Sequence, residues 1–196
     1  MKAFTHTTSA IIPLLRDNVD TDAIIPSREI RSVSKKGLAD GLFAGWRYAD
    51  EQRTPNPDFV LNKPEYQGAT ILATGGNLGC GSSREQAVWA LVEYGIHVVI
   101  APSFNSIFRR NCIRNGVLPI QLEPQPILAA QGPYHVDLES KSIRSADGQI
   151  WPFELEDEAT QMLLQGLDEI EMTLTAADKI NAFRAQDQQA RPWAYL

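Results

Sequence analysis

The middle of the chain alternates short apolar runs with longer amphipathic ones, and this alternation constrains the fold more than any other feature of the sequence. Strand candidates lie at Ala69–Ala73, Val98–Ala101 and Val117–Leu122. Helix candidates lie between them, at about Ser83–Tyr94 and at Phe104–Asn115, and a glycine of the kind that ends helices follows each. Strands and helices that alternate with short links predict parallel strands, right-handed crossovers and an α/β fold.

The segment before this unit is less regular. Ser9–Leu15 is predicted to form a strand, and Pro13 should confine it to a sheet edge because proline cannot donate a ladder hydrogen bond. Asn18–Asp22 is a loop of short polar side chains that hydrogen-bond their own backbone. Ser34–Leu42 is predicted to be a helix, and residues 53–67, with three prolines, to be an irregular excursion over the surface.

The last third of the chain contains both strand-like and helix-like sequence patterns. His135–Ser140 and Gln149–Phe153 alternate between apolar and polar residues, which predicts paired strands around a turn at residues 146–148. Helices are predicted near Asp157–Gln165 and Ala176–Gln189.

The length of the chain bounds the number of domains. At 196 residues, with 43% of them hydrophobic, the chain can bury one proper core but is short for two. We expect a single domain over residues 1–196, with an irregular excursion around 28–67 and a helical extension around 157–196.

The charge balance limits the partners. Eighteen basic and 24 acidic residues give a formal charge of -6, so we expect neither nucleic-acid nor membrane binding, and an anionic ligand must be held locally. The polar N-terminus lacks the apolar stretch of a signal peptide, and apolar runs stay below the roughly 18 residues of a membrane span. Two cysteines suit a reducing compartment, so a cytoplasmic location is predicted.

A glycine-rich stretch, GGNLGCGSSREQA at residues 75–87, lies where a predicted strand meets a predicted helix. Ligands often bind at this point of an α/β sheet, and the N–H groups and dipole of the next helix favour an anion. Ser82 with Glu85 and Ser83 with Gln86 both have the spacing of a capping box. Only one serine can be the cap, and if it is Ser83, the hydroxyl of Ser82 is free to face a ligand.

Other readings of this stretch are weaker. A Walker loop needs a lysine that is absent here, and the glycine spacing does not match a dinucleotide fingerprint. Cys80 is more often structural than nucleophilic in such a setting, because the histidines lack a recognisable partner pattern. Cys80 and Cys112 are too few for an iron–sulfur cluster, so we expect this chain to bind no metal and no cofactor by itself.

Several ordered motifs together resemble one known family. They extend over most of the chain and comprise Asn18–Pro26, Gly79–Glu85, Ala101–Phe104 and Asn115–Pro119. They are similar to motifs of the small subunits of 3-isopropylmalate dehydratases, the swivelling-domain chains of the aconitase superfamily. The likeness is incomplete, since Leu78 and Gln86 replace the residues usual in the family.

The resemblance implies a three-layer β/β/α domain that closes over an active site shared with a large subunit. A four-iron four-sulfur cluster is expected on that large subunit, and a small dicarboxylate is the expected substrate. The implied activity is that of a hydro-lyase, which isomerises 2-isopropylmalate to 3-isopropylmalate through isopropylmaleate on the way to leucine.

The resemblance also implies roles for particular residues. Ser82 matches the family's base, which acts as an alkoxide, and such a base needs N–H groups and a fixed cation around it. Asp22 is expected at the active site, orienting or balancing the charges there. Substrate carboxylates are expected to be held by Ser83, Arg84 and Arg28, with Gly79 and Gly81 supplying the loop backbone.

Three alternatives remain open from the sequence. The chain fits the small subunit of a related hydro-lyase for citramalate, dimethylmalate or a homoaconitate-like acid. It also fits a non-catalytic anion-binding or assembly module, in which Ser82 would be dispensable. A nucleotide-binding domain is the third possibility.

Overall fold

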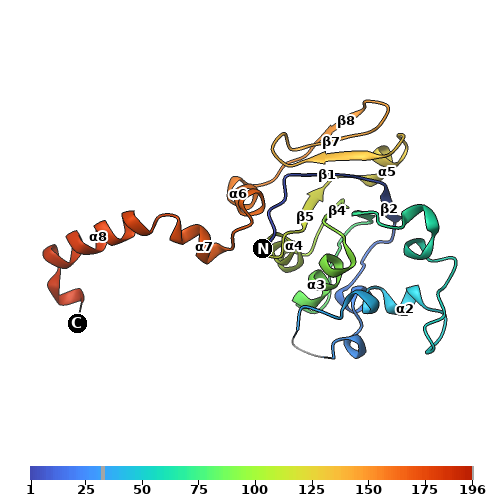
Figure 1. Cartoon of the computed structure of the whole chain (residues 1–196), viewed down its shortest axis with the longest axis horizontal. Coiled ribbons are helices and arrows are strands. Elements are labelled where there is room, and N and C mark those ends of the chain that lie inside the picture. Colours follow the sequence, from blue (N-terminus) through green and yellow to red (C-terminus); the bar gives the residue numbers. More distant parts are fainter. Residues whose placement is uncertain (32–33, 196) are drawn as a thin grey trace.

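Two four-stranded β-sheets pack face to face in the computed structural model, which describes residues 1–31 and 34–195, and helices cover the outer face of one sheet (Figure 1). The layers are therefore antiparallel sheet, parallel sheet and helices. This is the predicted three-layer β/β/α arrangement.

The parallel sheet has the strand order β2-β3-β4-β5. Its members are β2 (Ile11–Leu14), β3 (Ile71–Thr74), β4 (Val98–Ala101) and β5 (Leu118–Gln121). Strand β2 lies at an edge, as Pro13 predicts. Because the order advances in one direction, right-handed crossovers place the connecting helices on the same face, and the opposite face needs another cover.

The antiparallel sheet supplies that cover. Its order is β1-β6-β7-β8, and its members are β1 (His6–Ser9), β6 (Tyr134–Asp137), β7 (Ser142–Arg144) and β8 (Ile150–Pro152). The predicted direct pairing of residues 135–140 with 149–153 is wrong. Strand β7 lies between them, and the turn at 146–148 joins β7 to β8. We missed β7 because three residues are too few to display a period.

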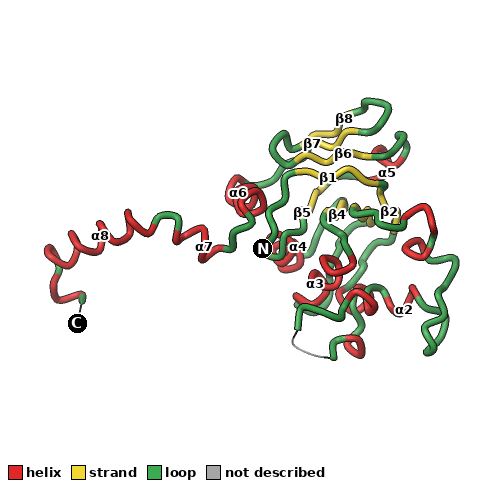
Figure 2. Tube along the Cα trace, in the orientation of Figure 1, coloured by secondary structure: helices red, strands yellow, loops and turns green. Residues whose placement is uncertain are grey.

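The helices that precede β5 lie on the outer face of the parallel sheet (Figure 2), whereas Ile127, of the short helix after β5, packs into the core between the two sheets. The helices are α1 (Thr21–Ile24), α2 (Ala44–Arg47), α3 (Glu85–Tyr94), α4 (Ser106–Arg114), α5 (Pro124–Leu128), α6 (Asp157–Gln165), α7 (Glu169–Leu174) and α8 (Ala177–Ala190). Short 3-10 turns lie at Ser27–Glu29, Ala39–Gly41, Val60–Asn62, Pro64–Tyr66 and Pro192–Ala194. Among the described residues, no helix is both long and apolar enough to cross a membrane.

Alternation along the strands divides the core in two. Ile71 and Ala73 of β3 face the antiparallel sheet, whereas Leu72 packs with the helices, and β4 repeats the pattern with Val98 and Val99. All of these side chains are essentially buried. A parallel strand covered on both faces is expected to be apolar throughout, which explains the continuous apolar runs that marked it in the sequence.

The helix predicted at Ser34–Leu42 is wrong. Within the described part of this range, only the 3-10 turn Ala39–Gly41 forms. The carboxylate of Glu93, on α3, accepts hydrogen bonds from the backbone N–H groups of Gly37, Leu38 and Ala39. A side chain more than 50 positions away thus satisfies these backbone groups in place of helical bonds.

The C-terminal part leaves the body of the molecule. Figure 1 shows α7 and α8 extending away from the sheets, and α8 has no buried residue. Glu169, at the start of α7, ties the extension to α4 through ion pairs with Arg110 (2.9 Å) and Arg114 (2.6 Å). These bonds, with Arg114 first, lower the pKa of Glu169 to about 2.

The ion pairs of Glu169 with Arg110 and Arg114 are expected to hold α7 against α4 in a pH-dependent way. A carboxyl whose pKa is lowered on folding stabilises the folded form fully above its ordinary pKa of 4.5, and the contribution is lost as the pH falls toward 2. Glu169→Gln should therefore reduce the hydrogen-exchange protection of the α7 amides at pH 7 and leave the strands unchanged. Glu158→Gln, in the first turn of α6, is the matched control. Equal protection of α7 in both variants would contradict a structural role for the Glu169 ion pairs.

Candidate active site

The glycine loop runs between two other loops at the carboxyl edge of the parallel sheet. On one side, Gly79 N donates to Val19 O (2.8 Å) and Thr21 N donates to Cys80 O (3.0 Å). These bonds continue the pairing of β2 with β3 beyond the ends of both strands. They place the Asn18–Asp22 segment beside the serine motif.

On its other side, the glycine loop pairs with the segment that leads into α4. Leu78 N donates to Ser103 O (3.1 Å), and Asn105 N donates to Leu78 O (2.9 Å). Asn105 then caps α4, because its side chain accepts from Ile107 N and Phe108 N. The side chain of Leu78, one of the departures from the family, is buried in the core behind the loop.

Gly79 is required by both its conformation and its neighbour. Its φ is +75°, and a Cβ at this position would overlap the Cβ and ring of Phe108 on α4. Gly81 also has a positive φ, of +83°, but a Cβ there would meet its nearest neighbour at an ordinary 3.4 Å. The close approach of loop and helix therefore depends chiefly on Gly79.

Neither serine of the motif caps α3, so the capping-box prediction is wrong. Arg84 occupies the cap position in an extended conformation, and no side chain caps the helix. The helix begins at Glu85, one residue later than a Ser83 cap would start it and two later than a Ser82 cap would. The backbone of Ser82 is held from elsewhere, since the buried Thr21 hydroxyl donates to Ser82 O at 2.7 Å. Ser82 and Ser83 are both exposed.

Asp22 and Arg84 meet at this turn, although 62 positions separate them. Arg84 Nη1 donates to Asp22 Oδ1 and also to Ile25 O at 3.3 Å. The hydrogen bond from Arg84, and then one from the Ser27 backbone, lower the pKa of Asp22. The pair keeps Asp22 ionised and fixes the guanidinium next to the two serines.

The anchored guanidinium has one edge without a partner among the described residues. Only Nη1 of Arg84 is engaged by the residues that the structure describes. The Nε and Nη2 groups are the pair that grips a carboxylate through two parallel hydrogen bonds. The Arg84 side chain as a whole is 22% exposed.

Arg28 lies apart from this cluster. It is in the turn Ser27–Glu29, its side chain is 69% exposed, and its Nε lies 3.5 Å from Glu29 Oε1. Within residues 1–31 and 34–195, Arg28 makes no ion pair with the serine turn. The structure thus brings together Asp22, Ser82, Ser83 and Arg84, and a role for Arg28 stays a prediction.

A narrow hollow lies beside the serine turn and reveals a residue that we missed. Ser82, Ser83 and Arg84 form one side of it, and Thr21 and Asn111 contribute to the lining. The hollow is too narrow to enclose a water molecule. The sequence offered one signal for Asn111, because it follows Phe108 at helical spacing and so shares the face of α4 that meets the loop.

The cysteines do not form a cluster site. Cys80 is half-buried in the loop, and Cys112 is buried on α4, where burial raises the pKa of its thiol. Among the described residues, no group of three His, Cys, Asp or Glu side chains is placed to hold a metal ion. These residues do not fit an iron–sulfur cluster, which takes three or four thiolates.

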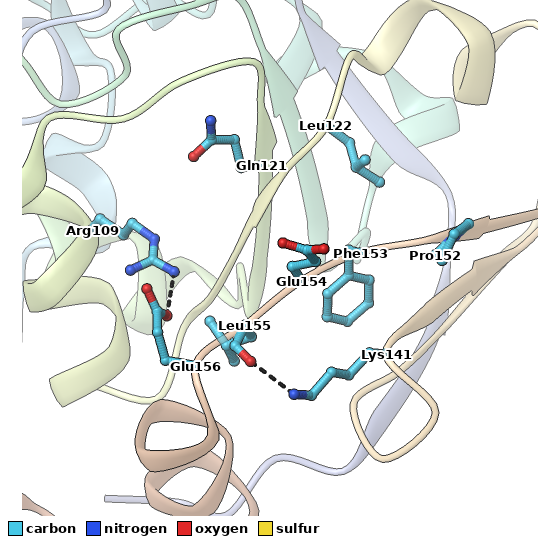
Figure 3. Close-up of a pocket in the computed structure, with 9 residues that line it drawn as sticks. All are labelled: Arg109, Gln121, Leu122, Lys141, Pro152, Phe153, Glu154, Leu155 and Glu156. Atoms are coloured by element: carbon cyan, nitrogen blue, oxygen red, sulfur yellow. Dashed lines mark hydrogen bonds and ion pairs between the residues drawn. The ribbon is translucent and has the colours of Figure 1, made fainter.

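A larger cleft, of about 930 Å³, lies elsewhere, between the end of β5 and the antiparallel sheet (Figure 3). Its cations already have partners. Arg109 Nη2 donates to Glu156 Oε2 (2.6 Å), and Lys141 Nζ donates to Leu155 O (2.8 Å). The cleft shares none of its lining with the serine turn. It is therefore a poor place for a dicarboxylate, in spite of its size.

The chain is similar to known proteins along its whole length. A model of the aconitase C-terminal domain family matches residues 1–125. The 3-isopropylmalate dehydratase small subunit of Cupriavidus necator is 51% identical, over 100% of this chain and 99% of that protein. The protein of the same name from Neisseria gonorrhoeae is 44% identical over the same shares. A solved structure of 3-isopropylmalate dehydratase from Methanocaldococcus jannaschii is 30% identical, with a TM-score of 0.66 over 91% of this chain and 99% of that one.

Gly79→Ala is expected to destabilise the fold by about 2–5 kcal/mol, because a left-handed backbone penalty adds to the overlap with Phe108. Gly148→Ala is the matched control, since Gly148 has a φ of +87° but nothing within 4 Å of a Cβ. That variant should lose only about 1–2 kcal/mol. Urea unfolding of both variants measures the difference. Equal losses would show that the loop does not depend on its contact with α4.

Proposed function

Because this chain belongs to the family of 3-isopropylmalate dehydratase small subunits, within the aconitase superfamily, we propose that it isomerises 2-isopropylmalate to 3-isopropylmalate together with a large subunit. The reaction is a dehydration followed by a rehydration, a step toward leucine, and the chain works in the cytoplasm. The observation that carries the proposal is the Asp22–Arg84 pair beside the exposed Ser82.

In this proposal, Arg84 binds a carboxylate of the substrate. Asp22 and Ile25 O hold Nη1, so the guanidinium is oriented before substrate arrives, and the edge formed by Nε and Nη2 takes a substrate carboxylate. The Ser83 hydroxyl adds a hydrogen bond to the same ligand. Arg28 is exposed one residue beyond Ser27, which binds Asp22, and is proposed to meet the second carboxylate.

Ser82 is the base. As an alkoxide, it takes a proton from the carbon next to a carboxylate while the hydroxyl of the neighbouring carbon leaves as hydroxide. In rehydration, the Ser82 hydroxyl returns its proton to the carbon that lost the hydroxyl, and hydroxide adds to the other carbon. An alkoxide needs positive charge and N–H groups nearby. Arg84 and the uncapped first turn of α3 supply both.

The large subunit completes the site. Ser82 and Ser83 are exposed, and the hollow beside them cannot enclose even a water molecule, so this chain alone cannot surround a dicarboxylate. The iron–sulfur cluster belongs to the large subunit in this proposal, since the described residues here do not fit one. The small subunit then contributes the base, Ser82, and the arginine that binds a substrate carboxylate, Arg84.

Ser82→Ala is expected to leave assembly with the large subunit intact and to lower kcat by about 100- to 10,000-fold, the usual worth of a general base. Turnover of 2-isopropylmalate by the reconstituted complex measures the effect, and gel filtration checks assembly. Ser140→Ala, after β6 in the other sheet, is the control. If Ser82→Ala turned over like the parent, the chain would be an assembly module rather than a catalytic subunit.

Arg84→Lys should raise KM by about 10- to 100-fold, since a lysine keeps the charge but loses one of two hydrogen bonds, each worth about 1.5–3 kcal/mol. Asp22→Asn should raise KM by a smaller factor, because the carboxylate that holds the Arg84 guanidinium is lost. Initial-rate kinetics of the complex give both values, and Arg144→Lys on β7 serves as the control. An unchanged KM in Arg84→Lys would show that Arg84 does not bind a substrate carboxylate.

A further inference from the structure

The turn that carries Arg28 is bound to the rest of the chain at both of its ends. At its first residue, Ser27 N and Oγ donate to Asp22 Oδ1, at 3.2 and 3.3 Å. At its last residue, the carboxylate of Glu29 forms an ion pair with Arg53 Nη2. Arg28 lies between these two bound residues, and its own side chain is 69% exposed. The residues on either side of Arg28 therefore decide where it is presented.

The contact at Glu29 is the more buried of the two. The Glu29 side chain is only 9% exposed, and a Cβ at Gly41 would lie 2.7 Å from Glu29 Cβ, so the two segments pack closely. Arg28 Nε is 3.5 Å from the other carboxylate oxygen, which is too far for a strong hydrogen bond. A buried carboxylate needs a bound cation, because an unpaired charge is costly away from water. Without Arg53, Glu29 is expected to turn toward water, and its end of the turn to move with it.

The side chain of Arg53 is held on several sides. Its Nη2 binds Glu29, and its Nη1 donates to Asp40 O at 3.0 Å. The guanidinium carbon lies 5.1 Å from the centre of the Tyr48 ring, a cation–π contact. The backbone of Arg53 has a φ of +62°, which is uncommon for a residue with a side chain and persists where the surrounding contacts stabilise it. Arg53 is thus a fixed bridge between two segments.

We propose that Arg53 is a positioning residue: by binding Glu29, it holds the turn that presents Arg28, and so fixes where the second carboxylate of the substrate is bound. This role rests on the proposed function, which assigns that carboxylate to Arg28. Arg53 does not act through Arg84, because the guanidinium of Arg84 is bound by other groups. A residue in the surface excursion thereby determines how well a dicarboxylate binds.

A pair of substitutions tests whether Arg53 acts through Arg28 in the complex reconstituted with the large subunit. Arg53→Gln should raise KM for 2-isopropylmalate by about 5- to 20-fold and leave kcat within about twofold, because binding is weakened while the base is untouched. Arg28→Ala should raise KM by about 10- to 100-fold, the worth of a charged hydrogen bond. In the Arg28→Ala background, Arg53→Gln should raise KM no further, since the residue that it positions is gone.

Arg109→Gln is the matched control. Arg109 forms an ion pair of the same kind, with Glu156, and its side chain is 26% exposed, against 34% for Arg53. Each variant loses one ion pair, so thermal unfolding of the two should be affected alike. Only Arg53→Gln should raise KM. Arg53→Lys keeps a positive charge beside Glu29 and should recover part of the lost binding.

Several results would overturn the role of Arg53. These are an unchanged KM in Arg53→Gln, the same rise in KM when Arg53→Gln is added to Arg28→Ala, and an equal rise in Arg109→Gln. A parent-like KM in Arg28→Ala would also overturn it, while the proposed function would stand if Ser82→Ala is inactive. If Ser82→Ala is active, the proposed function fails, and the role of Arg53 fails with it.

Discussion

The backbone pairing of the glycine loop with the loops on both sides of it is the constraint on which the rest of the site depends. Val19 and Thr21 bond the loop on one side, and Ser103 and Asn105 bond it on the other. The ladders of the parallel sheet thereby extend past the last strand residues. Since Gly79 has no side chain, α4 packs directly on the loop. Three segments from distant parts of the sequence are thus joined by hydrogen bonds into one edge.

The chemistry of the site follows from this edge. The loop after β2 brings Asp22 to the turn before α3, and Asp22 then orients Arg84 and is itself kept ionised. Ser82 stays on the surface because its carbonyl, rather than its hydroxyl, is used to hold the turn. The fold uses the backbone of Ser82 to hold the turn, while the side chains of both serines are exposed.

The two faces of the parallel sheet are covered by different elements. One is sealed by the antiparallel sheet, and the other carries the helices whose ends approach the site. Helix α4 connects the site with the C-terminal extension, because Phe108 and Asn111 face the loop while Arg110 and Arg114 bind Glu169. The exposed Ile170, Leu174 and Phe183 lie on that extension, beyond the packed layers.

The sequence by itself determined the α/β order of the central unit, the edge position of the strand with Pro13, and the place of the serine motif between a strand and a helix. These features depend on periodicity and on residues close in the chain, which a pattern displays. Only the tertiary structure decided that neither serine caps α3, that residues 34–42 form no α-helix within the described part, and that Asn111 of α4 lines the hollow beside the serine turn. Each of these depends on a side chain or backbone group that packing brings from a distant segment, and local patterns carry no record of such contacts.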